Sequence, residues 1–266
     1  MKLTIDHKTW YSYDDQVKLS TQYLRLTPQN TPNQQIVHWE LMLPGEATKT
    51  VDAYGNVMHV LTLDSPHQVL EIQARGEVTI LEHDDFSYTD ECHLSPLVFL
   101  RFSPLTQPDR DIRAFAQEHW QEAQPLVSLE ALMTAVLEKM PYCPGSTTVA
   151  DTASEVFARG TGVCQDHSHV FLACCRSLGI PARYVSGYLY TDNNEHVATH
   201  AWVEAFVNDR WESFDITNNT RDTRQHLKLA VGVDYLDACP VRGVRLGGGG
   251  ESMRAVAAVQ KVAPQQ

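Results

Sequence analysis

The segment Gly160–Tyr190 places the strongest constraint on how this chain can fold. It reads GTGVCQDHSHVFLACCRSLGIPARYVSGYLY, in which two glycines precede Cys164, Gly179 ends an apolar run, and alternation begins at Arg183. The pattern predicts a turn, a buried helix over residues 165–178 and then a strand. A thiol directly after a glycine-rich turn lies at a helix N-terminus, where backbone N–H groups and the helix dipole favour the thiolate.

Two residues that could assist Cys164 occur on the next predicted strands. His200 begins one strand and Asp215 follows the other, and only the turn Asn208-Asp209 separates the two strands. An antiparallel pair joined by this turn has His200 and Asp215 at the same open end. A nucleophilic thiol needs a base and a third group that orients the base. We therefore predict Cys164, His200 and Asp215 as catalytic residues, with the carboxylate accepting the Nδ1 proton of His200 and Nε2 facing the sulfur.

Each of these three residues also has an ordinary structural interpretation. Cys164 could be a packing thiol in a buried helix, as most free cysteines are. His200 could be a strand histidine bonded to a backbone carbonyl, and Asp215 a turn or N-cap residue before Thr217. The order and spacing of all three residues together favour the catalytic interpretation.

Four sequence blocks resemble those of the transglutaminase-like superfamily, whose members have a papain-like fold. The blocks are GVCQDHSHVF, GIPARYVSGYL, HAWVEAF and WESFD, and the later segments VGVDY and PVRG extend the resemblance to the bacterial subgroup with an N-terminal β domain. The resemblance implies a Cys–His–Asp triad at Cys164, His200 and Asp215 and thiol-dependent acyl transfer on the amide bonds of a peptide or protein substrate. We expect peptide or isopeptide hydrolysis; protein-glutamine transamidation or deamidation remains the alternative. No cofactor and no metal are implied, and the absence of a DxDxDG segment gives no reason to expect calcium.

The chain departs from the subgroup at two places. His167-Ser168-His169 stands where an aromatic and a small residue are common, and Ile216 replaces the proline after the triad aspartate. The two imidazoles could tune the thiol or bind a metal, but we favour positions in the core or on the surface. Ile216 leaves the carboxylate in place. The side-chain oxyanion donor stays open among three candidates, Tyr142, Gln165 and Trp202.

The order of predicted elements indicates an α+β fold. Short alternating runs separated by turn signals predict an N-terminal β-sandwich-like domain over residues 1–95. The remainder, 96–266, is expected to form the papain-like catalytic domain, with the cysteine helix packed on an antiparallel sheet. Helices are predicted over 109–120, from an N-cap at Ser128, and over 152–159, and a closing strand is predicted over 253–262.

Composition narrows the choice of partners and of compartment. The chain has 33 acidic and 21 basic residues and a net charge of -12, which argues against nucleic acid or an anionic membrane as a partner. The polar, alternating start has no apolar segment typical of a secretory signal, so we expect a cytoplasmic protein with reduced cysteines. The N-terminal region could restrict the cleft, dock a partner or form a homo-oligomer.

Two other classes of function compete with the thiol enzyme. A metal-dependent hydrolase would use His167, His169, Cys164 and His200, because imidazole and thiolate suit zinc. However, two histidines separated by one residue point apart on a helix. A binding or scaffold protein that keeps the fold without the chemistry is the second alternative, and the intact set of three residues argues against it.

Overall fold

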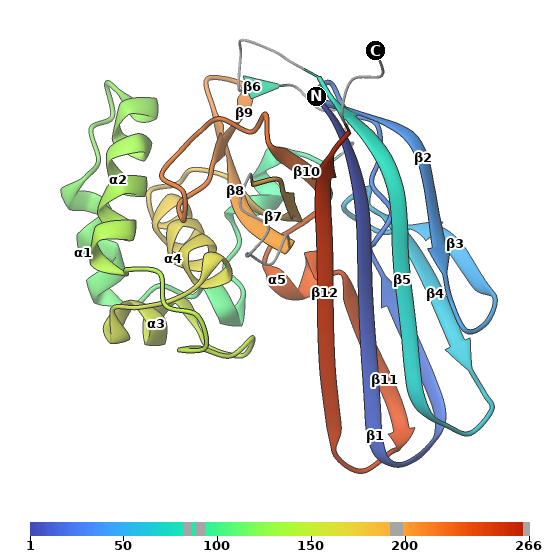
Figure 1. Ribbon diagram of the computed structural model, residues 1–266. Coiled ribbons are helices and arrows are strands. Elements are labelled where there is room, and N and C mark those ends of the chain that lie inside the picture. Colours follow the sequence, from blue (N-terminus) through green and yellow to red (C-terminus); the bar gives the residue numbers. More distant parts are fainter. Residues whose placement is uncertain (82–86, 89–93, 192–198, 263–266) are drawn as a thin grey trace.

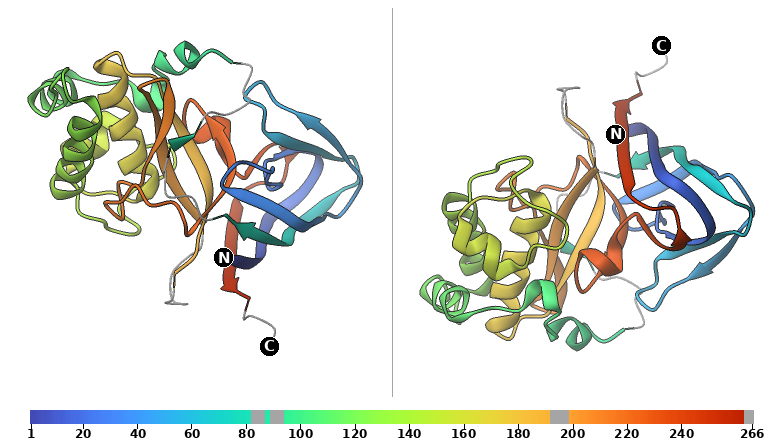
Figure 2. Two further views of the ribbon diagram at one scale, coloured as in Figure 1. Left: turned by 90° about the horizontal axis from the view of Figure 1, so that it is seen from above. Right: turned by 90° about the horizontal axis from the view of Figure 1, so that it is seen from below.

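The computed structural model describes residues 1–81, 87–88, 94–191 and 199–262. The elements form three layers (Figures 1 and 2): a group of helices, a five-stranded sheet, and a larger curled antiparallel sheet. One core lies between the helices and the five-stranded sheet, and a second core lies inside the curled sheet. The α+β class predicted from the sequence is confirmed. Residues 2–80 of the N-terminal region, however, contribute to one curled sheet and not to two facing sheets, and Ser87–Tyr88 joins the five-stranded sheet.

The curled sheet is organised around one long strand. Strand β1 (Lys2–Leu24) is a single element of 23 residues, with an irregular register between Ser12 and Val17. On one side, its first part pairs with β5 and its last part with β4; on the other side the partners are β12 and β11. The other strands of this sheet are β2 (Gln34–Met42), β3 (Ala47–Val51), β4 (Val57–Leu63), β5 (His67–Ile80), β11 (Val241–Gly247) and β12 (Glu251–Lys261).

The end of the described chain returns to this first sheet. The predicted closing strand is confirmed as β12, which pairs with β1 from Leu3 opposite Lys261 to Tyr13 opposite Glu251. Gly247, Gly248 and Gly249 have positive φ values in the turn between β11 and β12, which explains the glycine run. Residues 241–261, which the sequence analysis assigned to the catalytic region, thus lie in a sheet with residues 2–80. The domain boundary at residue 95 stays a prediction.

The five-stranded sheet has the strand order β10-β7-β8-β9-β6. Its central hairpin forms as predicted, because Asn208 and Asp209 both have positive φ, as a two-residue turn of this kind requires. The strands are β6 (Ser87–Tyr88), β7 (Ala182–Leu189), β8 (Thr199–Val207), β9 (Arg210–Phe214) and β10 (His226–Gly232).

The central helix α4 (Cys164–Ser177) is buried from Asp166 to Arg176. It contacts α1, α2, α3, β7 and β8. Two 3-10 helices, η1 (Pro96–Leu100) and η2 (Pro104–Thr106), precede four further α-helices: α1 (Arg110–Glu118), α2 (Pro125–Lys139), α3 (Ala153–Arg159) and α5 (Tyr235–Ala238). The predicted N-cap at Ser128 is wrong: α2 begins at Pro125, a residue favoured at a first helical position, and the buried Ser128 hydroxyl donates to the carbonyl of Gln121.

The C-terminal end of α4 is held by one buried arginine. Arg176 is 4 % exposed, and its guanidinium donates to the carbonyl oxygens of Phe99, Ala182 and Val233 and to the hydroxyl of Thr106. Charged groups are rarely buried without such partners. These bonds connect α4 to both 3-10 helices, to β7 and to the residues after β10.

The curled sheet packs against the face of the five-stranded sheet that lies away from α4. Tyr188, Leu227 and Leu229 of that sheet belong to the core of the curled sheet. The Tyr188 hydroxyl and Nδ1 of His7 lie 2.8 Å apart, and burial lowers the pKa of His7 to about 4. His7 is therefore a neutral residue of the interface between the two sheets.

Candidate active site

Cys164 is the first residue of α4, and its position depends on a close turn before it. The Asp166 carboxylate accepts the backbone N–H of Val163 at 2.8 Å and the hydroxyl of Thr147 at 2.7 Å. A Cβ on Gly162 would lie 2.7 Å from Cβ of Asp166, so only glycine permits this approach. The half-buried thiol thus lies at the N-terminus of a buried helix, as predicted.

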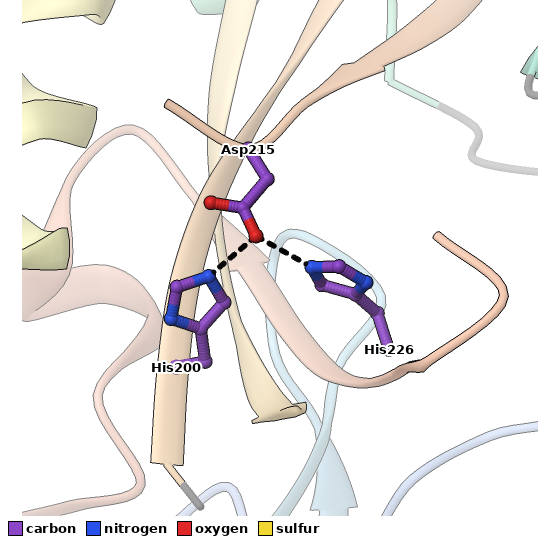
Figure 3. Close-up of side chains that lie close together, drawn as sticks. All are labelled: His200, Asp215 and His226. Atoms are coloured by element: carbon purple, nitrogen blue, oxygen red, sulfur yellow. Dashed lines mark hydrogen bonds and ion pairs between the residues drawn. The ribbon is translucent and has the colours of Figure 1, made fainter. Parts of the chain in front are cut away.

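His200 and Asp215 lie together at the open end of the β8–β9 hairpin (Figure 3). Nε2 of His200 donates to Oδ2 of Asp215 over 2.8 Å, and the aspartate is fully buried. Burial lowers the pKa of His200, but the charge and hydrogen bond of Asp215, together with a hydrogen bond to Cys164, outweigh burial and raise the pKa to about 10. Burial likewise raises the pKa of Asp215, and its two histidine partners outweigh this and bring the pKa far below its ordinary value. Both residues are therefore charged near neutral pH.

The orientation of the His200 ring differs from the prediction. We expected Nδ1 to face the carboxylate, whereas Nε2 does so and leaves Nδ1 on the other side of the ring, available to the thiol. The register of the hairpin explains this. Val203 pairs with Phe214, so continuing the ladder would place Asp215 opposite Trp202 and not opposite His200. The contact between His200 and Asp215 is therefore diagonal across the two strands. Nε2, the ring nitrogen farther from the backbone, spans this longer distance.

Asp215 has two further partners that sequence reasoning missed. Nε2 of His226, the first residue of β10, donates to the same Oδ2 over 2.8 Å (Figure 3). Asn218 donates its amide to Oδ2 over 2.7 Å and its backbone N–H to Oδ1 over 3.2 Å. The run HLKLAVG signals a strand that begins with a histidine. No sequence signal in or near that run indicates that this strand pairs with β7.

A glycine makes room between the two histidines. Gly187 of β7 pairs with His200 on one side and with Lys228 on the other. A Cβ on Gly187 would lie 2.8 Å from the indole of Trp202 and 2.1 Å from the carbonyl oxygen of Leu227. The Trp202 ring occupies this space and stacks on His200, with centroids 6.2 Å apart. It also meets His226 edge-on, with centroids 5.0 Å apart.

The histidines after Cys164 belong to the core, as we favoured. Nε2 of His167 donates to the carbonyl of Met140, and its Nδ1 accepts the hydroxyl of Thr217. Nε2 of His169 accepts the backbone N–H of Tyr235, and burial lowers the pKa of His169 to about 3. The ligand set imagined for a metal-dependent hydrolase is therefore not brought together.

The three candidate oxyanion donors lie in different surroundings. Gln165 donates its amide to the carbonyl of Val149, away from the triad partners. Trp202 lies against His200 and His226. Tyr142 is half exposed, and burial followed by the proximity of Cys164 raises its pKa. Tyr142 is thus the candidate that lies near the thiol.

His200, Asp215 and His226 form the one cluster of metal-ligand type within the described residues, with ligand atoms within 4.8 Å of one another. A metal-bound histidine usually donates its other ring N–H to an acceptor. Nδ1 of His226 has no hydrogen-bond partner in the described part of the chain, and His200 bonds Cys164 as well as Asp215. Both Nε2 atoms point at one carboxylate oxygen. This geometry suits two N–H donors on an anion better than a metal centre.

Two parts of the chain match known protein families. Residues 113–216 match the core of the transglutaminase-like superfamily, and residues 3–79 match the bacterial transglutaminase-like N-terminal region. The chain belongs to the transglutaminase-like superfamily. Cys164, His200 and Asp215 all lie within the matched core, whereas His226 follows it.

Other proteins resemble this chain over most of its length. An uncharacterized protein of Mycobacterium leprae is 28% identical over 278 residues, covering 98% of this chain and 99% of that protein. An uncharacterized protein of Mycobacterium tuberculosis is 30% identical over 270 residues, covering 90% and 86%. A solved structure from Cytophaga hutchinsonii, provisionally named a cysteine protease, covers 100% of this chain and 92% of its own, with a TM-score of 0.78 and 22% identity. That structure shares the transglutaminase-like fold. Within the described residues, no helix is both long and apolar enough to cross a membrane.

Proposed function

We propose that this protein is a thiol-dependent acyl-transfer enzyme that acts on amide bonds. Cys164 is the nucleophile, His200 its base and acid, and Asp215 the residue that orients His200. The observation that carries the proposal is the chain of contacts from Cys164 to His200 to the buried Asp215. A thiol beside a raised-pKa imidazole exists readily as a thiolate–imidazolium pair.

The reaction proceeds in two halves. The Cys164 sulfur attacks the amide carbonyl carbon, and the backbone N–H groups at the start of α4 stabilise the oxyanion. His200 gives its proton to the amide nitrogen, the carbon–nitrogen bond breaks, and the amine leaves a thioester on Cys164. Water then attacks the thioester and loses a proton to His200, which releases the carboxylic acid and restores the thiolate–imidazolium pair.

The acceptor of the acyl group decides between hydrolysis and transamidation. We propose hydrolysis of peptide or isopeptide bonds, which the provisional name of the Cytophaga hutchinsonii structure supports. An amine in place of water would give transamidation, and a glutamine side chain in place of a peptide bond would give deamidation. The partner is thus a peptide or protein amide and, with a net charge of -12, not nucleic acid. Five of the six cysteines are free thiols and Cys92 lies outside the described residues; these free thiols suit the cytoplasmic location that we propose.

The test is the rate of iodoacetamide alkylation between pH 4 and 9, followed for each cysteine by peptide mass. An ordinary thiol titrates near about 8.5 and reacts slowly in acid. We expect fast alkylation of Cys164 below about pH 6 and its loss in His200→Ala. Cys143, an exposed free thiol in the same molecule, is the internal reference. Equal alkylation rates for Cys164 and Cys143 in acid would contradict the proposal. If Cys164 reacts faster, assays with fluorogenic peptides and with glutamine plus an amine follow.

A further inference from the structure

The Asp215 carboxylate sits between two imidazoles that have different environments (Figure 3). His200 is hydrogen-bonded to Cys164, whereas His226 lies on the far side of the carboxylate from His200, 6 % exposed. Since an ionised carboxylate only accepts hydrogen bonds, Nε2 of His226 must carry a proton to make its 2.8 Å contact. Burial lowers the pKa of His226, so the ring is neutral and its Nδ1 holds a bare lone pair.

His226 is one of the residues that line a small cavity of about 20 Å³. The indole of Trp202 lines the same cavity. Nδ1 of His226 and Nε1 of Trp202 are both fully buried, and neither has a hydrogen-bond partner within the described residues. One of these atoms is an acceptor and the other is a donor. The two rings are in edge contact, with centroids 5.0 Å apart.

The cavity meets the requirements for one bound water molecule. A water needs roughly 10–15 Å³ of probe-occupied volume and two to four polar partners. It could accept the indole N–H of Trp202 and donate to Nδ1 of His226, which would satisfy both atoms at once. A buried polar atom left without any partner would cost about 1–3 kcal/mol, so the pair of atoms strongly favours an occupant of this chemistry.

We propose that this cavity binds a single water molecule which bridges Trp202 to His226, and that His226 thereby acts as a positioning residue for Asp215. The inference rests on the proposed function of Cys164, His200 and Asp215. By donating to Nδ1, the water favours the tautomer of His226 that the contact with Asp215 requires. With the proton on Nδ1 instead, the bare Nε2 would face Oδ2 of Asp215, and two lone pairs would push the carboxylate away from His200.

The curled sheet supplies one wall of this water site. Thr31, Asn33 and Gln34, at the start of β2, line the cavity opposite Trp202 and His226. Gln34 is anchored there because its side-chain amide accepts the backbone N–H of Lys228 at 2.8 Å and donates to the Lys228 carbonyl at 2.9 Å. The N-terminal region therefore contributes part of the lining of the site beside the second histidine of Asp215.

The first test uses the unaltered protein. Two-bond proton–nitrogen correlation spectra distinguish the two neutral tautomers of each histidine. We expect His226 to be neutral at pH 7 with its proton on Nε2. A high-resolution crystal structure should show one ordered oxygen within hydrogen-bond distance of Nδ1 of His226 and Nε1 of Trp202. A proton on Nδ1, or a cavity without that oxygen, would overturn the inference.

The second test compares two substitutions of matched polarity. The amide of His226→Gln reaches about as far as Nε2 of the imidazole, whereas the amide of His226→Asn reaches only about as far as Nδ1. We expect the alkylation rate of Cys164 at pH 5.5 to stay within about 3-fold of the original in His226→Gln and to fall about 10–100-fold in His226→Asn, the effect of losing a hydrogen bond to a charged group. Cys143 again serves as the reference, and circular dichroism establishes that each variant is folded.

The outcomes separate this inference from the proposed function. Slow alkylation of Cys164 in the unaltered protein contradicts the proposed function itself. Fast alkylation of Cys164 in the unaltered protein, with equal alkylation rates in His226→Gln and His226→Asn, overturns only the role of His226. If neither variant folds, the tautomer and the ordered oxygen still decide the question.

Discussion

The two ends of helix α4 are built for opposite purposes. At its N-terminus, Cys164 is half-buried and hydrogen-bonded to His200, whose charge depends on protonation. At its C-terminus, Arg176 is buried under carbonyl oxygens and a hydroxyl, and it is charged near neutral pH although burial lowers its pKa to about 10. One end therefore offers a group that can react, and the other fixes the helix in place. The comparison shows that a buried charge can hold a helix in place without taking part in a reaction. Substitutions at each end of α4 should separate the effect on reactivity from the effect on stability.

The largest expected effect comes from the reactive end. Cys164→Ser should abolish alkylation at this position, and Asp215→Asn should slow alkylation of Cys164 at pH 5.5 by about 10³-fold or more, because the orienting anion of His200 is lost. The free energy of unfolding of Cys164→Ser should change by less than about 0.5 kcal/mol, as measured by urea denaturation. A large loss of stability in Cys164→Ser would show that the thiol is a packing residue.

The next effect comes from the anchored end. Arg176→Met should lower the free energy of unfolding by about 3–5 kcal/mol, since buried carbonyl groups lose their donors. Arg110→Met, at the exposed start of α1, is the matched control and should change it by less than about 0.5 kcal/mol. Alkylation of Cys164 in the folded fraction of Arg176→Met should keep its dependence on pH. A changed dependence would mean that the two ends are coupled.

The dependence of stability on pH should also distinguish the ends. The pKa of His200 is raised in the folded state from 6.5 to about 10, so its contribution is fully present below pH 6.5 and is lost as pH rises toward 10. The difference in unfolding free energy between the unaltered protein and His200→Gln should therefore shrink by several kcal/mol between pH 6.5 and 10. Urea titrations at several pH values measure it. A constant difference would contradict the charged pair.

The smallest expected effect lies in the turn before Cys164. Gly162→Ala should lower the free energy of unfolding by about 1–3 kcal/mol, because the new methyl group would overlap Asp166. It should also slow the alkylation of Cys164, since the start of α4 must shift. Gly179→Ala makes a useful comparison, because its Cβ would meet no atom within 4 Å although its φ is positive. Equal alkylation rates of Cys164 in the two variants would show that the position of Cys164 does not depend on a glycine beside Asp166.

The sequence predicts what depends on neighbouring residues. Helix α4, the hairpin at Asn208-Asp209 and the approach of Asp215 to His200 all follow from signals within about fifty residues of chain. His226 could not be found in this way, because β10 pairs with β7 across an intervening hairpin. The return of β12 to β1 and the anchoring of Arg176 likewise depend on contacts between distant segments. The ring orientation of His200 required the strand register, which a pattern of residue types does not specify.

The pairing of β1 with β12 bears on how the protein is made. Leu3 emerges from the ribosome long before its partner Lys261. An early strand with an open edge is prone to pair with other chains. The curled sheet, which supplies Thr31, Asn33 and Gln34 to the cavity, thus completes only after β12 has been released. On this order of events, a nascent chain would carry its thiol long before it carried a closed site around Asp215.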